Sequence, residues 1–297
     1  MDSFSISQLA QFSGIKAHTI RIWEQRYNAL KPNRSEGNTR YYDNSQLRRL
    51  LNIVSLMESG YKVSELGTLP DETLFELLEK INTKDVAYEP TEYFISQLIA
   101  AGMNYDEGNF EKSFSHCLIR FGMKDAYLRV FHPMLERLGL MWSMNKIPPA
   151  NEHFISNLIR QKLFTAIDYL PAPDKSSDSW LLFLPENEFH EIGLLFAWYL
   201  IRLSGCKAVY LGSNVPEQSV FEAVTYTGVE NVLFFLVHHD FPDQIQNYIN
   251  KLTVDLAKKE VFVAGNQKLF SQLQTSKSLK LLNSVEDLLS LLPLKNI

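Results

Sequence analysis

Thr19-Ile20-Arg21-Ile22-Trp23-Glu24-Gln25-Arg26-Tyr27 is the stretch that decides how the N-terminus folds. Ile20 and Trp23 are three residues apart, which places both on one face of a helix and leaves the charged side chains on the other. We therefore predict a helix over Lys16–Tyr27. A shorter helix precedes it, capped by Ser5 or Ser7, and Gly14 supplies the turn between the two helices.

A two-stranded wing is predicted to follow. Glu36-Gly37-Asn38 suits the tip of a hairpin, because glycine tolerates a positive φ, and Arg34 and Arg40 flank that tip. Asn44 is predicted to cap a third helix with Leu47, Leu50, Leu51 and Val54 inward, which ends at Gly60. Two helices, a wing and a third helix predict a winged helix-turn-helix.

Charge supports a DNA-binding role for this segment. Residues 1–70 carry nine Lys/Arg and six Asp/Glu, a net charge of +3, whereas the rest of the chain carries −8. Local cationic density determines phosphate affinity, so we expect double-stranded DNA as the partner. Trp23 is interpreted as core, and a solvated basic face is the plain alternative. The candidate DNA contacts, mostly to phosphate, are Lys16, His18, Thr19, Arg21, Arg26, Arg34, Arg40 and Tyr41.

Composition narrows the class of protein. The chain has 297 residues, of which 45% are hydrophobic and 21% charged, as in soluble globular proteins of two or three domains. Neither an apolar run of membrane-spanning length nor a secretory leader is apparent. Cys117 and Cys206 are too few for a disulfide framework or a zinc site. A cytoplasmic protein with no membrane association is therefore expected.

The middle of the chain is predicted to be a helical bundle. A first domain over 1–85 ends in a small helix, Thr73–Ile81, and a linker. A second domain over 88–173 shows apolar residues at helical spacing, with glycines and prolines between the helical runs. Four such runs indicate a four-helix bundle: Tyr93–Ala101, Phe110–Phe121, Ala126–Leu138, which Pro133 either starts or kinks, and Phe154–Tyr169.

The last domain, 177–297, alternates short apolar strands with helices, which predicts an α/β fold with a parallel, Rossmann-like or flavodoxin-like sheet. Ligands of such sheets bind at the carboxyl ends of the strands. The predicted strands are Trp180–Leu184, Ala208–Leu211, Asn231–Val237, Val261–Ala264 and Lys280–Leu282. The predicted helices are Glu191–Ser204, Pro216–Tyr226, Asp243–Lys258, Gln267–Gln274 and Val285–Leu291.

Three histidine-containing patterns stand out in these two domains. Trp142 is followed after nine residues by Glu152-His153, which by itself indicates packing and a helix cap. Glu188-Phe189-His190 comes directly after the first strand. His238-His239-Asp240 invites a metal interpretation, but adjacent strand residues point opposite ways, which favours solvated loop histidines.

The N-terminal motifs resemble the MerR family of regulators. The Arg-x-Trp-Glu-x-Arg-Tyr form, with the Asn38–Tyr42 wing, is typical of a branch whose members carry a cobalamin-binding C-terminus. Trp-x9-Glu-His is similar to the mark of the CarA/CarH (LitR) type of light-responsive repressor. That resemblance implies that Trp142 shields an adenosyl group, that Glu152 binds its sugar, and that His153 could replace it as upper axial ligand of cobalt.

Glu188-x-His190-x-x-Gly193 is similar to the (Asp/Glu)-x-His-x-x-Gly motif of base-off cobalamin domains. The resemblance implies that His190 is the lower axial ligand of cobalt and that Glu188 accepts the other ring proton and fixes the tautomer. Gly193 would let the next helix pass close under the corrin ring. The segment Leu211–Pro216, with Gly212, matches the same family.

Two departures concern the nucleotide tail of cobalamin. The family has Ser-x-Leu near the end of the third strand, where this chain reads Phe234-Phe235-Leu236-Val237. It has Gly-Gly after the fourth strand, where this chain has Gly265-Asn266. Three outcomes remain open: cobalamin binding with different tail contacts, weaker binding, or a fold that has lost the ligand.

The resemblance implies a DNA-binding repressor, not an enzyme, that binds promoter DNA, senses adenosylcobalamin and acts as a photoreceptor. The alternative is a MerR-type regulator with a degenerate cobalamin fold, controlled by a partner protein or another ligand. A corrinoid methyl carrier or mutase is disfavoured, because a DNA-binding head stands where a catalytic partner domain is needed. Thr73–Ile81 is too short for a dimerisation coil, so we expect a homo-oligomer, a dimer or tetramer, assembled through the bundle and sheet domains.

Overall fold

A computed structural model describes residues 4–34, 38–58, 60–82, 91–143, 147–173, 178–237, 242–266, 270 and 279–293. The chain divides into two compact units, Met1–Leu158 and Ile159–Ile297. The first unit contains both the N-terminal head and most of the helical region, and the second contains the α/β sheet. The predicted domain boundaries near residues 85 and 173 stay predictions.

The head has the predicted elements in the predicted order, with one further short helix, α4, that was not predicted. Its elements are α1 (Ile6–Ser13), α2 (Ala17–Tyr27), β1 (Asn33–Arg34), β2 (Arg40–Tyr41), α3 (Asn44–Glu58), α4 (Val63–Leu66) and α5 (Asp71–Asn82). Ser5, rather than Ser7, caps α1, in a reciprocal capping box with Gln8. Gly14 ends α1 with a φ of 71°, a conformation that glycine adopts without strain.

The N-cap of α3 is Asp43, so the prediction that Asn44 caps this helix was wrong by one residue. Asp43 Oδ1 accepts from the backbone N–H of Gln46 at 2.9 Å and from the hydroxyl of Ser45 at 2.6 Å. An aspartate satisfies the unpaired N–H groups of a first turn as well as an asparagine does. The two neighbouring residues were therefore equivalent candidates from sequence alone.

The wing is an antiparallel pair in which Asn33 lies opposite Tyr41 and Arg34 opposite Arg40. Asn38 has a φ of 58°, as a tight hairpin connection requires. The other two residues of the predicted tip, Glu36 and Gly37, lie outside the described residues.

Four α-helices make up the helical region: α6 (Thr91–Met103), α7 (Glu107–Ala126), α8 (His132–Ser143) and α9 (Pro149–Asp168). The single helix predicted over Ala126–Leu138 is instead a π-helical turn, η1 (Tyr127–Phe131), followed by α8. Pro133 lies in the first turn of α8. Proline has no backbone N–H, and its ring clashes with the carbonyl group of the preceding turn. The wider π-helical turn just before Pro133 makes room for this ring.

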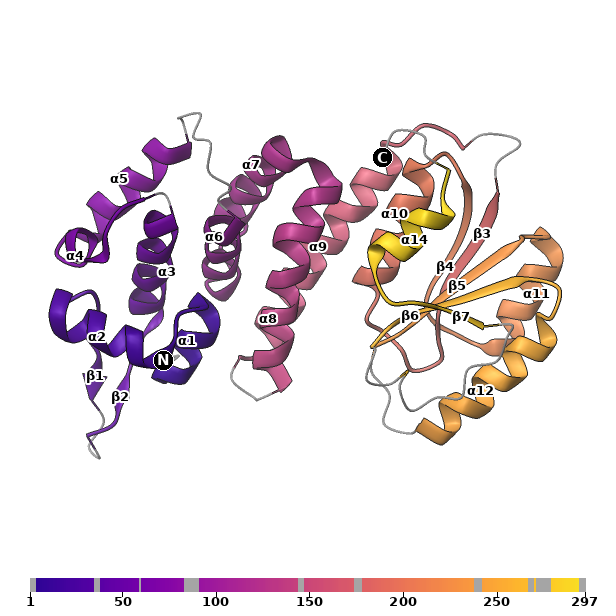
Figure 1. Cartoon of the computed structure of the whole chain (residues 1–297), viewed down its shortest axis with the longest axis horizontal. Helices are drawn as coiled ribbons and strands as arrows, with labels where there is room; N and C mark the ends of the chain where they lie inside the picture. Colours follow the sequence, from indigo (N-terminus) through magenta and orange to yellow (C-terminus); the bar gives the residue numbers. More distant parts are fainter. Residues whose placement is uncertain are drawn as a thin grey trace. The chain divides into compact units, whose positions relative to one another are not determined.

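The sheet domain has five parallel strands, β3 (Ser179–Pro185), β4 (Lys207–Val215), β5 (Asn231–Leu236), β6 (Glu260–Gly265) and β7 (Leu279–Leu282). Their order is β4-β3-β5-β6-β7, which is the flavodoxin-like arrangement. The helices are α10 (Ile192–Leu203), α11 (Glu217–Thr227), α12 (Pro242–Asp255) and α14 (Val285–Leu291). Figure 1 shows α10 and α14 on one face of the sheet and α11 and α12 on the other.

Large apolar side chains fix the strands in place. Phe183 of β3 and Phe234 of β5 are fully buried, with ring centroids 5.6 Å apart. They lie in a cluster with Val220 of α11 and Ile249 of α12, and each such side chain stabilises the fold by ~1.5–3 kcal/mol. The carboxyl ends of β3 and β5 are therefore held rigidly. The helix predicted over Gln267–Gln274 lies outside the described residues except for Phe270.

None of the helices in the described parts of the chain is long and apolar enough to cross a membrane.

Candidate DNA interface and candidate ligand site

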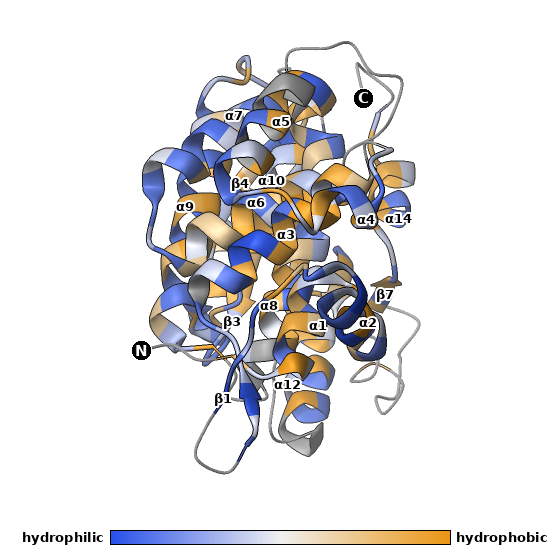
Figure 2. Cartoon of the chain, turned by 90° about the vertical axis from the view of Figure 1, so that its left-hand side faces the viewer, coloured by the Kyte–Doolittle hydropathy of each residue, from blue (hydrophilic) through white to orange (hydrophobic). Residues whose placement is uncertain are grey.

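Helix α2 presents a polar face to solvent. Ile20 and Trp23 are buried, which confirms that Trp23 belongs to the core. Thr19 is partly exposed, and four of the predicted DNA contacts are exposed: Lys16, His18, Arg21 and Arg26. Figure 2 shows α2 and β1 coloured largely as hydrophilic. This exposed, cationic face is available to a phosphate backbone.

The wing is tied to α2 through Glu24. Glu24 Oε1 forms an ion pair with Arg40 Nε at 3.0 Å, and Glu24 Oε2 accepts from the hydroxyl of Tyr42 at 2.9 Å. Burial, followed by the hydrogen bond to Glu24, raises the pKa of Tyr42. Arg40 therefore has a structural role that the sequence did not reveal, and its predicted DNA contact stays a prediction.

Of the two remaining predicted wing contacts, Arg34 is the more exposed. Arg34 Nη1 donates to Asn38 Oδ1 at 2.5 Å across the hairpin, so its guanidinium is held near the tip. Tyr41 is partly buried. Exposure is compatible with a DNA contact at Arg34 in particular.

Arg137 joins the head to the helical region within the first unit. Its guanidinium makes a two-pronged pair with Glu92 of α6, at 2.5 and 3.0 Å, and Arg137 Nη1 also donates to the carbonyl of Phe12 at 3.1 Å. Phe12 lies in the last turn of α1, where carbonyl groups carry partial negative charge. A basic residue in an amphipathic helix gives no sequence signal for such a role.

The His190 loop follows β3 and has the geometry that the motif implied. Glu188 is 1% exposed, and its Oε1 lies 2.6 Å from His190 Nδ1 and accepts from the backbone N–H groups of Phe189 and His190. A carboxylate facing Nδ1 favours the tautomer in which Nδ1 carries the ring proton and Nε2 keeps the lone pair. The His190 side chain is 52% exposed.

Further hydrogen bonds hold this loop between two strand ends. Glu188 Oε2 accepts from the N–H of Val237 at the end of β5. Its carbonyl accepts from the N–H of Asn214 near the end of β4, and Asn214 Oδ1 accepts from the N–H of Asn187. Gly212 has a φ of 82°, where β4 bends beside the loop. The imidazole is therefore mounted on a rigid base.

Glu191, the residue after the histidine, anchors a second network that sequence reasoning missed. It is buried, accepts from the hydroxyl of Tyr210 at 2.6 Å and pairs with Arg160 Nη2 at 2.5 Å. Burial and this hydrogen bond raise the pKa of Tyr210. The Tyr210 ring stacks on Trp198 at 4.4 Å.

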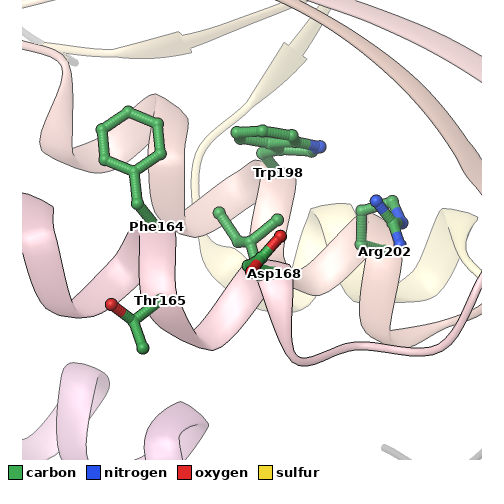
Figure 3. Close-up of a pocket in the computed structure, with 6 residues that line it drawn as sticks. Phe164, Thr165, Asp168, Trp198 and Arg202 are labelled. Carbon is green, nitrogen blue, oxygen red and sulfur yellow. The ribbon is translucent and has the colours of Figure 1, made fainter.

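An open hollow of about 490 Å³ lies beside Trp198. Figure 3 shows the side chains that line it, which come from the C-terminal part of α9 and from α10. Phe164 meets Trp198 edge-on at 6.2 Å. The other lining residues are Thr165, Ile167, Asp168 and Arg202. Arg202 donates to the carbonyl of Pro171, so this region ties the end of α9 and the chain after it to α10.

The predicted upper-face residues lie in the first unit. Trp142, near the end of α8, is 45% exposed and is not a core residue. Glu152 lies in the first turn of α9 and His153 follows it; the His153 side chain is 72% exposed and its Nδ1 lies 3.5 Å from Glu152 Oε2. These three residues are thus placed on accessible helix ends.

The end of β5 and Gly265-Asn266, where the sequence departs from the family at the nucleotide tail, are closely packed, and Phe235 of β5 also packs against Gly193. A Cβ on Gly193 would lie 3.0 Å from the ring of Phe235. A Cβ on Gly265 would lie 2.1 Å from the carbonyl oxygen of Leu236, and Gly265 has a φ of 132°. Asn266 Nδ2 donates to the carbonyl of Val237 at 3.4 Å.

The described residues contain no group of three or more His, Cys, Asp or Glu side chains that could hold a metal ion by themselves. His238-His239-Asp240 lies outside the described residues. Cys117 and Cys206 are buried and unbridged, and burial raises the pKa of Cys117 to about 12.

Comparison with known proteins agrees with the two-part organisation. Residues 4–72 match the family model described as MerR HTH family regulatory protein. The chain is 26% identical over 225 residues to the HTH-type transcriptional repressor CarH of Myxococcus xanthus, covering 75% of each chain. It is also 26% identical over 264 residues to the repressor CarA of the same organism, covering 88% of this chain and 85% of that one.

Among solved structures, the monomethylamine corrinoid protein of Methanosarcina barkeri aligns with a TM-score of 0.55 and 12% identity. The alignment covers 68% of this chain and 97% of that protein. At this identity the likeness concerns the fold. It confirms the predicted combination of a helical region with a flavodoxin-like sheet.

Proposed function

We propose that this chain, a transcription regulator of the MerR type rather than an enzyme, responds to a corrinoid held at the carboxyl edge of its α/β sheet. The head would bind double-stranded promoter DNA through the exposed face of α2 and the wing. Repression is the proposed sign of regulation, because both relatives are named repressors. A DNA target would place the protein in the cytoplasm.

The observation that carries this proposal is the pair Glu188 and His190. A buried carboxylate that accepts the Nδ1 proton fixes the tautomer in which Nε2 can donate its lone pair to a metal. The loop stands at the end of β3, next to β5, where ligands of doubly wound sheets bind. A single such histidine suits cobalt, because the corrin ring supplies the equatorial ligands.

The finer proposal is adenosylcobalamin. Trp142, Glu152 and His153 are accessible on helix ends and would contact the adenosyl group. When bound, adenosylcobalamin supplies a cobalt–carbon bond that light cleaves, which would make the regulator light-responsive. His153 is proposed as the upper-face histidine.

The residues present suit one part of cobalamin better than another. The axial residues suit a corrinoid, because His190 is exposed and its tautomer is fixed. The nucleotide side does not suit it as well, because Phe235 packs on Gly193 and Asn266 bonds to Val237. Gly212 and Gly265 have positive φ values that the strand geometry requires. The fold alone therefore explains these two glycines, and they give no separate support for a ligand.

The test is an absorption spectrum of purified protein after incubation with adenosylcobalamin in darkness and removal of unbound ligand. We expect a retained corrinoid spectrum that His190→Ala abolishes. His132→Ala removes an exposed histidine of α8 and is the matched control, expected to behave as wild type. A protein that retains neither adenosylcobalamin nor any other corrinoid would refute the proposal.

Regulation is tested with DNA from upstream of the gene, in mobility-shift assays in darkness and after illumination. We propose that the ligand assembles a homo-oligomer that binds this DNA and that light releases it. Sedimentation velocity under the same conditions measures the assembly. Unchanged sedimentation and DNA binding in a corrinoid-loaded sample would contradict this part.

A second candidate is favoured by the packing of Phe235 on Gly193. A sheet domain without corrinoid would be controlled by a partner protein or another ligand. In that case His190→Ala would leave regulation of the promoter untouched.

A further inference from the structure

Any site in which His190 binds cobalt must also accommodate the nucleotide of cobalamin. The nucleotide is covalently attached to the corrin ring and binds cobalt from the lower face in free cobalamin. If His190 occupies that position, the nucleotide must leave cobalt and be accommodated on the same side, between the His190 loop and the sheet edge. This inference rests on the proposed function.

Phe235 occupies the approach to that space. It is the next-to-last residue of β5, and its side chain is partly buried against Gly193, in the first turn of α10. The ring stands so close that even one added methyl group on Gly193 would contact it at 3.0 Å. The gap between β5 and the start of α10 is therefore filled by an aromatic side chain.

The neighbouring gap is closed by backbone contacts. The backbone N–H of Asn266 donates to the carbonyl of Leu236 at 2.9 Å, and its side chain donates to the carbonyl of Val237. Glu188 holds the N–H of Val237 from the other side. The last residues of β5 are thus bonded both to the His190 loop and to the end of β6.

We propose that this site selects corrinoids that lack the nucleotide arm, of the cobinamide class, and that Phe235 determines this specificity. The exposed imidazole can reach cobalt from the loop without any opening between the strands. Housing a ribose, a phosphate and a base requires displacement of the Phe235 ring from a packed position, which costs free energy. A corrinoid without the arm avoids that cost.

The experiment compares adenosylcobinamide with adenosylcobalamin, which share the corrin ring and the upper ligand and differ in the nucleotide. Dissociation constants are measured in darkness by titration of the full chain. Wild type should bind adenosylcobinamide at least about tenfold more tightly, a ratio that corresponds to ~1.4 kcal/mol. Phe235→Ser should bring the two constants to within about threefold, chiefly by tightening adenosylcobalamin.

Phe221→Ser is the matched control, because Phe221 is a partly exposed phenylalanine of α11; it should keep the wild-type ratio. Equal or tighter binding of adenosylcobalamin by wild type would overturn the specificity while leaving the proposed function intact. Binding of neither compound would refute both. The wild-type ratio decides the question even if Phe235→Ser does not fold, which circular dichroism would reveal.

Discussion

Glu188 orients the exposed imidazole of His190 with one carboxylate oxygen. Its other carboxylate oxygen and its backbone carbonyl fix the loop that carries this imidazole. Partners that orient a metal-binding histidine typically contribute 10–100-fold to metal affinity. Here the same side chain also accepts from the backbone N–H of Val237, the residue directly after β5. One residue therefore fixes both the tautomer of His190 and the position of its loop.

Replacing this carboxylate should weaken the ligand site. Glu188→Gln keeps the shape but cannot accept at both oxygens, so the Nδ1 proton of His190 loses its carboxylate. We expect corrinoid affinity to fall by ~10–100-fold, measured by spectroscopic titration. Glu186→Gln, which changes an exposed neighbour, should have no effect, and equal losses in both variants would show that charge alone matters.

Asp43 offers a test of the head. Asp43→Ala removes the N-cap of α3 and should cost ~1 kcal/mol of stability. The hydrogen bond from Ser45, then that from Gln46, lowers the pKa of Asp43. Because the folded pKa lies below the unfolded value, this stabilisation is present above about pH 4 and is lost as the pH falls through the folded pKa.

Urea unfolding of wild type and variant at pH 7 and at pH 3 measures this effect. Asp43→Asn is the control, since asparagine caps equally well without titrating. A difference between wild type and Asp43→Ala that does not shrink at low pH would contradict the assignment of the cap.

For single residues, the sequence motifs predicted contacts between side chains that are close together in the chain. Glu188 and His190 are two residues apart on one loop, so their contact could be anticipated. Arg160 and Tyr210 meet Glu191 only through the tertiary fold, and a one-residue choice such as Asp43 over Asn44 depends on backbone geometry. Contacts between distant segments leave no pattern in a single sequence.

Among the elements, α2 and the wing act together through Glu24. The ion pair with Arg40 and the hydrogen bond from Tyr42 set the position of β2 relative to α2. A rigid wing presents its basic side chains at a fixed distance from the helix. This arrangement favours simultaneous contacts to phosphates.

Salt dependence should reveal these contacts. Arg21→Ala removes an exposed cation from α2, so DNA affinity should fall for all sequences. The slope of log affinity against log salt should decrease by about 0.9 for one lost phosphate contact. Lys207→Ala makes the same charge change in the sheet domain and should leave the slope unaltered. An unchanged slope for Arg21→Ala would remove Arg21 from the interface.

Arg137 links three helices, and its geometry is specific to a guanidinium. Lysine cannot form two parallel bonds to Glu92 while also donating to Phe12. Arg137→Lys should therefore destabilise the first unit by ~1.5–3 kcal/mol, the range for hydrogen bonds to charged groups, with faster amide exchange in α1. Arg120→Lys, at an exposed position of α7, should be neutral in the same assays.

Regular elements were predictable where periodicity is strong. All five predicted strands are present, and Val285–Leu291 is a helix as expected. The sheet order was left open between two arrangements, because strand pairing is a long-range property. The π-helical turn before Pro133 was missed, since its cause lies in backbone hydrogen bonding and not in side-chain spacing.

For the whole molecule, the packing of the head on the helical region is the main unpredicted feature. Residues 51–56 of α3 are buried without interruption, although a surface helix normally keeps a polar face exposed. Asn52 accepts from the Gln97 amide of α6 at 3.0 Å. Helix α6 thus covers the side of α3 that the head leaves open.

A fragment of residues 1–82 should therefore fold poorly. Without α6, α3 would expose several aliphatic side chains, each contributing ~1.5–3 kcal/mol, out of a total stability of ~5–15 kcal/mol. Thermal unfolding followed by circular dichroism should show a weak transition for this fragment and a cooperative one for the full chain. A fragment as stable as the full chain would mean that α6 adds nothing to the head.

Gly265 has a consequence for surveys of genomes. Its φ and the nearby carbonyl of Leu236 require glycine for the strands to approach, whether or not a ligand is present. A search profile that rewards this glycine will therefore accept chains with the sheet and no corrinoid. Positions 188 and 190, which orient the exposed imidazole, should separate the two groups better, and weighting them would make genome-wide counts of corrinoid-responsive regulators more accurate.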